Sequence, residues 1–171
     1  ALDSTSLLEL ETLPESLIFI GAGYIGAELA QMMSRMGVKV TLVTRSHLLP
    51  GAEPEVSGAL TDAFAAEGIT LLTGLSYENV RRDAGCVTLR VMQDGKPVQV
   101  TADHLVSTAG RRANTDGLGV DKIGIETDAR GSIVIADDMQ TSVPGIYAAG
   151  DVTDRDQFVY MAAYGAKLAV K

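Results

Sequence analysis

The stretch LIFIGAGYIGAELAQMM, residues 17–33, joins an apolar run, a glycine-rich turn and an amphipathic segment. The run SLIFI at 16–20 is short and apolar, as buried strands are. From Tyr24 to Met36 the apolar residues recur at helical spacing, and Gly37 marks the expected helix end. A strand, a tight glycine turn and a helix form the opening unit of a doubly wound α/β domain.

Strand and helix patterns continue to alternate after this unit. VKVTLV at 38–43 and ITLL at 69–72 are apolar, and the segment PEVSGALTDAFAAEG at 54–68 carries its apolar residues at helical spacing. We therefore expect the fold class to be α/β, with a Rossmann-like, doubly wound parallel sheet over residues 16–113. Its strands should be buried on both faces, as parallel strands usually are.

An antiparallel meander insertion is expected between residues 77 and 102. CVTLRVM and PVQVTA flank QDGKP, whose Asp94 and Gly95 suit a hairpin turn. HLVSTAG at 104–110 then has the apolar pattern of a strand that returns to the parallel sheet.

Residues 114–171 follow a different pattern, rich in turns and short apolar runs. GIYAAGD predicts an apolar strand, and FVYMAAYGAKLAV has helical periodicity. We expect this segment to belong to a second domain.

Composition limits the partners of this chain. A formal net charge of −8 argues against nucleic acid and anionic membrane surfaces as partners. One cysteine excludes an internal disulfide framework, and no apolar run approaches the ~20 residues of a membrane span. The sequence opens with no basic, apolar leader pattern. We expect a cytoplasmic protein with a sizeable core.

The glycine turn predicts a dinucleotide site. Gly21 permits the tight turn, Gly23 lets a pyrophosphate approach the backbone, and Gly26 lets helix and strand pack closely. The helix start offers unpaired N–H groups and the positive end of a dipole to the phosphates. The alternative is that these glycines serve packing only.

The end of the second expected strand bears on which nucleotide binds. NAD sites place an acidic residue there, whereas NADP sites place a cation for the 2′-phosphate. The sequence has Thr44 at that position, followed by Arg45 and Ser46. Because a guanidinium can pair with a phosphate, this favours NADPH over NADH, with NADH still possible. The alternative is that Arg45 is a solvated surface charge.

Three ordered motifs carry a resemblance to a family. GAGYIGAELA, STAGRRANT and TSVPGIYAAGD, in this order, resemble the flavoprotein pyridine nucleotide-disulfide oxidoreductases. LETLPESL and DVTDRDQFVYMAAYGAKLAV look most like the mercuric reductase branch of that family. The resemblance implies NADPH and FAD as cofactors, a homodimer when intact, and flavin and dimerisation domains as partners of this chain. It also implies that residues 1–15 link to an N-terminal FAD segment, 16–113 bind the nucleotide, and 114–171 form the second segment of the FAD-binding domain.

The resemblance assigns roles residue by residue. Tyr24 matches a tyrosine that covers the flavin, Glu28 a glutamate near the nicotinamide, and Val80 a position whose backbone lies beside the adenine. Ala113 stands where the family usually has proline, and Gly51 where some NADPH-using members carry a second basic residue. The residues assigned to the nucleotide are Gly21, Gly23, Tyr24, Ile25, Gly26, Glu28, Thr44, Arg45, Ser46, Val80, Ala109 and Gly110.

The resemblance also assigns a flavin contact surface. Asp151 matches an aspartate that bonds the ribityl chain, and residues 157–159 match positions that line the flavin near its ring. The residues assigned to FAD are Gly150, Asp151, Gln157, Phe158 and Val159.

No catalytic or metal-binding residue is expected in this chain. Family members pass electrons to a pair of redox cysteines, whereas Cys86 is the single cysteine here and is expected to pack on a strand. His47 and His104 lack metal-ligand spacing; we expect them in a loop and at a strand edge. Dihydrolipoamide dehydrogenase or another disulfide reductase remains an alternative parent. A non-catalytic nucleotide-binding module is the alternative from another class.

Overall fold

The computed structural model describes residues 1–170. The chain divides into two compact units after Gly110, three residues before the boundary expected from sequence. Each unit is described separately below.

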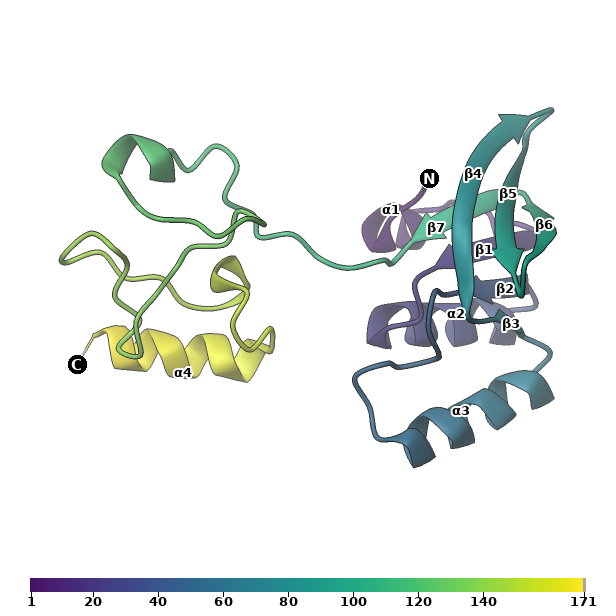
Figure 1. The fold of residues 1–171 in the computed structure, drawn as a ribbon, viewed down its shortest axis with the longest axis horizontal. Coiled ribbons are helices and arrows are strands. Elements are labelled where there is room, and N and C mark those ends of the chain that lie inside the picture. Colours follow the sequence, from purple (N-terminus) through teal and green to yellow (C-terminus); the bar gives the residue numbers. More distant parts are fainter. Residues whose placement is uncertain (171) are drawn as a thin grey trace. The chain divides into compact units, whose positions relative to one another are not determined.

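Unit 1 is built on a four-stranded parallel sheet (Figure 1). The strands are β1 (Ser16–Ile20), β2 (Lys39–Val43), β3 (Thr70–Leu72) and β7 (His104–Ser107). Their order is β3-β2-β1-β7, and every neighbouring pair is parallel. The parallel sheet expected from the alternating apolar runs is therefore confirmed. All four carboxyl ends lie at one edge of the sheet, where ligands of doubly wound folds bind.

Two longer helices connect these strands. The helix α2 (Tyr24–Arg35) lies between β1 and β2, and α3 (Pro54–Ala66) lies between β2 and β3. Both end as the sequence predicts, because Gly37 and Gly68 follow them with φ values of 91° and 77°.

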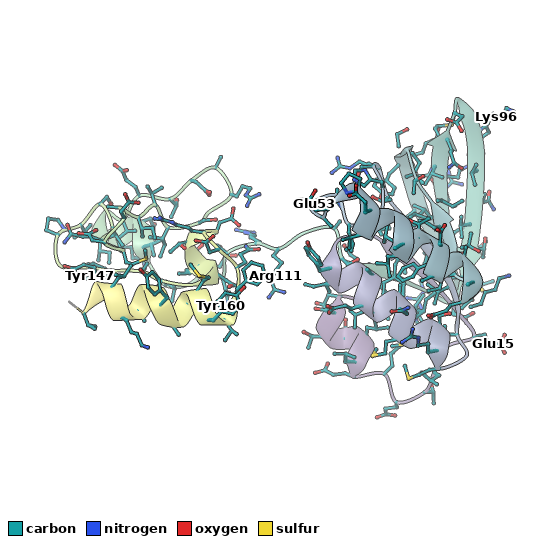
Figure 2. The ribbon with its side chains drawn as sticks, turned by 90° about the horizontal axis from the view of Figure 1, so that it is seen from below. Glu15, Glu53, Lys96, Arg111, Tyr147 and Tyr160 are labelled. Atoms are coloured by element: carbon teal, nitrogen blue, oxygen red, sulfur yellow. The ribbon has the colours of Figure 1, made fainter. Side chains whose placement is uncertain are left out.

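A three-stranded antiparallel meander stands between β3 and β7 in the chain. Its strands are β4 (Leu75–Asp83), β5 (Cys86–Gln93) and β6 (Lys96–Ala102). The hairpin between β5 and β6 turns at Asp94 and Gly95, both with positive φ, as expected. Figure 2 shows Lys96 at the far end of this meander. β4 itself had no separate signal in the sequence, because eight of its nine residues are exposed.

The parallel sheet is buried on both faces, since alternate residues of β1 point into two different cores. Leu17 and Phe19 pack with residues of α2 and α3, including Ala30 and Phe64. Ile18 packs with Val43 and with the inner face of the meander; the residues of the meander in this core are Leu75, Val87, Leu89, Val91 and Ala102. The unit thus has three layers: helices, parallel sheet and meander.

Residues 1–15 contain local structure that the sequence did not indicate. The helix α1 (Ser4–Leu8) is capped by Asp3, whose carboxylate accepts from the Ser6 N–H at 2.8 Å. Leu7 is buried in the helix-side core, and Leu2 forms a parallel bridge with Val106 of β7. This segment therefore packs on unit 1 over part of its length.

Over residues 111–170, unit 2 is held by turns, isolated bridges and short helices. It contains the short 3-10 helices η1 (Val120–Ile123) and η2 (Asp151–Thr153) and the helix α4 (Val159–Ala169), which was expected. The strand expected at GIYAAGD is wrong: Tyr147 makes a single bridge with Gln140. Gly145 and Gly150 bracket this segment with φ values of 81° and 84°, which an extended strand does not permit.

Candidate functional site

The glycine turn lies at the carboxyl edge of the sheet, between β1 and α2. Gly21 has a φ of +102°, and a Cβ built on it would come within 2.6 Å of the Thr108 carbonyl oxygen. A Cβ on Gly26 would overlap the Gly21 carbonyl oxygen and lie 2.7 Å from Thr108 Oγ1. Both glycines are therefore required by contacts inside the protein.

Gly23 differs from its two neighbours in the motif. Its φ is −75°, a value open to any residue, and a Cβ there would meet nothing within 4 Å. It forms the N-cap of α2, and no side chain caps this helix. Packing therefore gives no reason for glycine at this position, whereas a pyrophosphate approaching the free helix start would need the space.

Thr108 holds the turn in shape. Its hydroxyl reaches the carbonyl oxygens of Ile20 and Gly21 at 3.0 and 2.8 Å. The Thr108 N–H also donates to the Ile20 carbonyl at 2.8 Å. The first glycine of the turn is thus attached both to its own strand and to the end of β7.

The segment after β2 is joined to the end of β3. The Thr44 N–H donates to the Leu72 carbonyl at 2.9 Å, and the Gly74 N–H donates to the Ser46 carbonyl at 3.0 Å. Thr44 is buried, whereas Arg45 and Ser46 are exposed. Among residues 1–170 no carboxylate forms an ion pair with Arg45. Its guanidinium is therefore available to an anion in solution.

One carbonyl connects this segment to the glycine turn. The Val43 carbonyl, the last of β2, accepts a hydrogen bond from the Gly21 N–H at 3.0 Å. It also accepts one from the Tyr77 hydroxyl at 3.3 Å. The end of β2, the glycine turn and the base of the meander therefore meet at a single atom.

The other residues assigned to the nucleotide have varied surroundings. Tyr24 and Glu28 lie exposed on α2, and Ile25 is partly buried. Ala109 lies beside Gly21, since its Cα would be 2.8 Å from a Cβ there, and Gly110 is exposed with a φ of +126°. Val80 pairs with Leu89 in the meander and is 51% exposed.

The candidate flavin surface lies within unit 2. Gly150 and Asp151 begin η2, and Asp151 lies 3.8 Å from Arg111. The Gln157 amide donates to Asp154 at 2.8 Å. Phe158 and Tyr160 stack with centroids 5.4 Å apart, and both are exposed at the start of α4; Figure 2 shows Tyr160 on this helix.

The structure also places the residues for which no functional role was expected. Cys86 is partly buried at the start of β5, His47 lies in the segment after β2, and His104 lies on the edge strand β7. Residues 1–170 contain no group of three or more His, Cys, Asp or Glu side chains placed to hold a metal ion. Among the same residues, no helix is both long and apolar enough to cross a membrane.

This chain is similar to a family of known proteins. The family model described as "Pyridine nucleotide-disulphide oxidoreductase" matches residues 1–167. The chain belongs to this family. It is 43% identical over 162 residues to mercuric reductase from Streptomyces lividans, a match that covers 95% of the chain and 34% of that protein. It is 34% identical over 171 residues to dihydrolipoyl dehydrogenase from Geobacillus stearothermophilus, covering 99% of the chain and 36% of that enzyme.

Two solved structures share the fold. The HOCl-induced flavoprotein disulfide reductase RclA from Escherichia coli, in a Cu(II) complex, matches with a TM-score of 0.87 and 30% identity, covering 96% of the chain and 37% of RclA. LpdA from Mycobacterium tuberculosis gives 0.87 and 31%, covering 98% and 36%. The chain therefore spans about a third of the length of these relatives.

Two residues of the candidate site were not indicated by the sequence. The sequence assigned no role to Thr108, although its hydroxyl fixes the glycine turn. No role was expected for Tyr77, whose side chain bonds the end of β2. A contact between the Val80 backbone and an adenine stays a prediction. An aromatic residue soon after the third parallel strand was the available signal for Tyr77.

Proposed function

We propose that this chain is the nucleotide-binding portion of a flavin-dependent oxidoreductase similar to mercuric reductase. The observation that carries the proposal is Gly23, whose side-chain position is open although its two partner glycines are enclosed. The family membership supports the same conclusion. In this proposal residues 16–113 bind NADPH, residues 114–171 belong to the FAD-binding domain, and residues 1–15 lead from an earlier segment of that domain.

The residues of unit 1 suit the phosphates of NADPH. The pyrophosphate would lie against the backbone at Gly23, where the N-terminus of α2 is free of side-chain caps. Arg45 stands at the end of β2 with no acidic residue beside it in the sequence, so it suits the 2′-phosphate of NADPH. When bound, NADPH supplies a hydride that FAD accepts. The role of the protein is to hold and orient both groups.

Unit 2 offers groups that suit a flavin. The Asp151 carboxylate is half exposed and only loosely paired with Arg111, so it is available to accept hydrogen bonds from a ribityl chain. The exposed aromatic pair Phe158 and Tyr160 offers apolar area beside it. We assign no catalytic role to Cys86. In the complete protein, reduction of Hg(II) would depend on cysteine pairs that this chain does not supply.

A second parent activity has a specific observation in its favour. The 34% identity to dihydrolipoyl dehydrogenase covers 99% of the chain. Since a nucleotide-binding portion does not contact the final acceptor, a dithiol or disulfide substrate suits the same site. For either parent we expect a cytoplasmic homodimer.

The test is a calorimetric titration of the chain with NADPH and, separately, with NADH. We expect NADPH to bind more tightly, and Arg45→Glu to weaken NADPH at least tenfold while it changes NADH little. The reason is that the new carboxylate would repel the 2′-phosphate, and tenfold corresponds to about 1.4 kcal/mol. Equal losses for both nucleotides would contradict the role of Arg45, and no binding of either would refute the proposed site.

A further inference from the structure

Tyr77 stands at the candidate site although no motif assigns it there. Its hydroxyl donates to the Val43 carbonyl at the end of β2, two residues before Arg45. Burial raises the pKa of the Tyr77 phenol, and the positive charge of Arg45 partly offsets that rise. The phenol therefore lies within the electrostatic reach of the guanidinium that we assign to the 2′-phosphate.

Tyr77 lies two residues after the buried Leu75 and opposite the buried Val91, so its side chain is on the same face of β4 as Leu75, and a bulge follows it. Tyr77 pairs with Val91 and Asn79 pairs with Arg90, so Glu78 is an extra residue between two regular pairs. The ladder is regular from Leu75 to Tyr77, so the bulge changes the register only of the residues of β4 that follow Tyr77.

The bond from Tyr77 to Val43 is one that the protein can give up. The Val43 carbonyl keeps the Gly21 N–H as a donor at 3.0 Å when the phenol turns away. Tyr77 is 36% exposed, so the residue is not enclosed by the protein. Its bond of 3.3 Å is longer than the roughly 2.5–3.0 Å that is usual for hydroxyl donors, so it is weak. A charged acceptor close by would form a shorter and stronger bond.

We propose that the Tyr77 hydroxyl is a second donor to the 2′-phosphate of the bound nucleotide, beside Arg45. This proposal rests on the proposed NADPH site and adds a specificity-determining residue to it. Position 51, six residues after Arg45, is glycine in this chain and supplies no second cation. Tyr77 would supply the additional donor from the meander instead of from the segment after β2.

The experiment compares Tyr77→Phe with the unaltered 171-residue chain. Titrations with NADPH, NADH, adenosine 2′,5′-bisphosphate and AMP are followed by calorimetry. The control variant is Tyr147→Phe, which removes a phenol in unit 2 whose hydroxyl accepts from the Gln140 amide at 3.2 Å. We expect Tyr77→Phe to weaken NADPH and the bisphosphate about tenfold, to leave NADH and AMP unchanged, and Tyr147→Phe to change none of them.

Two results would overturn the assignment of Tyr77. Unchanged NADPH affinity in Tyr77→Phe would show that the hydroxyl does not touch the nucleotide. Equal losses of NADPH and NADH would show that Tyr77 acts on the shared part of the nucleotide through Val43 and the glycine turn. Both results leave NADPH binding by the unaltered chain intact and so leave the proposed function standing. Absence of NADPH binding by the unaltered chain would refute both.

Discussion

Replacing Gly23 by alanine separates a binding role of the glycine turn from a packing role. Alanine accepts the φ of −75°, and its Cβ would meet nothing within 4 Å. Alanine reduces the backbone freedom of the unfolded chain, which stabilises the folded state by about 0.4–1 kcal/mol. Alanine is also a poorer helix N-cap than glycine, which destabilises the folded state by a similar amount. We therefore expect the free energy of unfolding of unit 1 to change by less than about 1 kcal/mol.

The matched control is Gly26→Ala in the same turn. Its Cβ would overlap the Gly21 carbonyl oxygen and press on Thr108 Oγ1 at 2.7 Å. Both neighbours are fixed by the turn, so the strain should cost about 1–3 kcal/mol or more. The two variants should therefore affect different properties. Gly26→Ala should lower the free energy of unfolding of unit 1, whereas Gly23→Ala should lower the affinity for NADPH.

The assay combines hydrogen exchange with calorimetry. Exchange of the β1 and β2 amides reports the opening free energy of unit 1 separately from that of unit 2. We expect Gly23→Ala to keep this protection and to lose at least tenfold in NADPH affinity, about 1.4 kcal/mol, because the methyl group occupies the space of the pyrophosphate. Unchanged affinity in Gly23→Ala would mean that the turn only packs, and our reasoning about its open position would fail.

Three further changes test other parts of the structure. Ser57→Ala removes the buried hydroxyl that donates to the Leu48 carbonyl, so the free energy of unfolding of unit 1 should fall by about 1–3 kcal/mol in the same exchange assay. An unchanged free energy of unfolding would contradict a stabilising role of this hydrogen bond. Asp128 accepts from the backbone N–H groups of Ser132 and Arg130, which hold its pKa below the ordinary value of 3.8. The stabilisation by the ionised Asp128 carboxylate is therefore present above pH 3.8 and is lost as the pH falls through the lower pKa of the folded state. In Asp128→Asn the unfolding midpoint should fall less between pH 6 and pH 3 than in the unaltered chain. An equal fall in both proteins would refute this role of Asp128. Cys86→Ser should leave nucleotide affinity in the titration unchanged, and a loss would show that the thiol has a role beyond packing.

The sequence predicted the elements that carry a clear period or a glycine signal. β1, α2 and the turn between them follow from apolar spacing and from glycines that contacts require. The hairpin at Asp94 and Gly95 follows from the preference of such turns for positive φ.

Other features depend on contacts that no local pattern reports. β4 is exposed on nearly every residue, so it shows no alternation that would predict a strand. The apolar run before Asp151 looks like a strand, but it lies between glycines with positive φ and makes a single isolated bridge. α1 is too short to show a helical period, and it is held by a local cap and by Leu7.

The candidate site shows the same division. Gly21, Gly26 and the segment 44–46 were located by motif and spacing, and the structure brings them to one edge of the sheet. The position of Tyr77 depends on the register of β4 against β5, which places it opposite Val91 just before a one-residue bulge. The register between two strands is set by pairing across the sheet, so it cannot be predicted from the composition of one strand.

The two bonds from the Thr108 hydroxyl bear on the kinetics of binding. They hold the glycine turn in its final geometry by contacts within the protein alone. A nucleotide that meets a preformed surface spends little time or entropy on rearranging it, so rearrangement of the turn should not limit the association of either NADPH or NADH. The contact that we propose between Arg45 and the 2′-phosphate would then lengthen the residence time of NADPH relative to NADH.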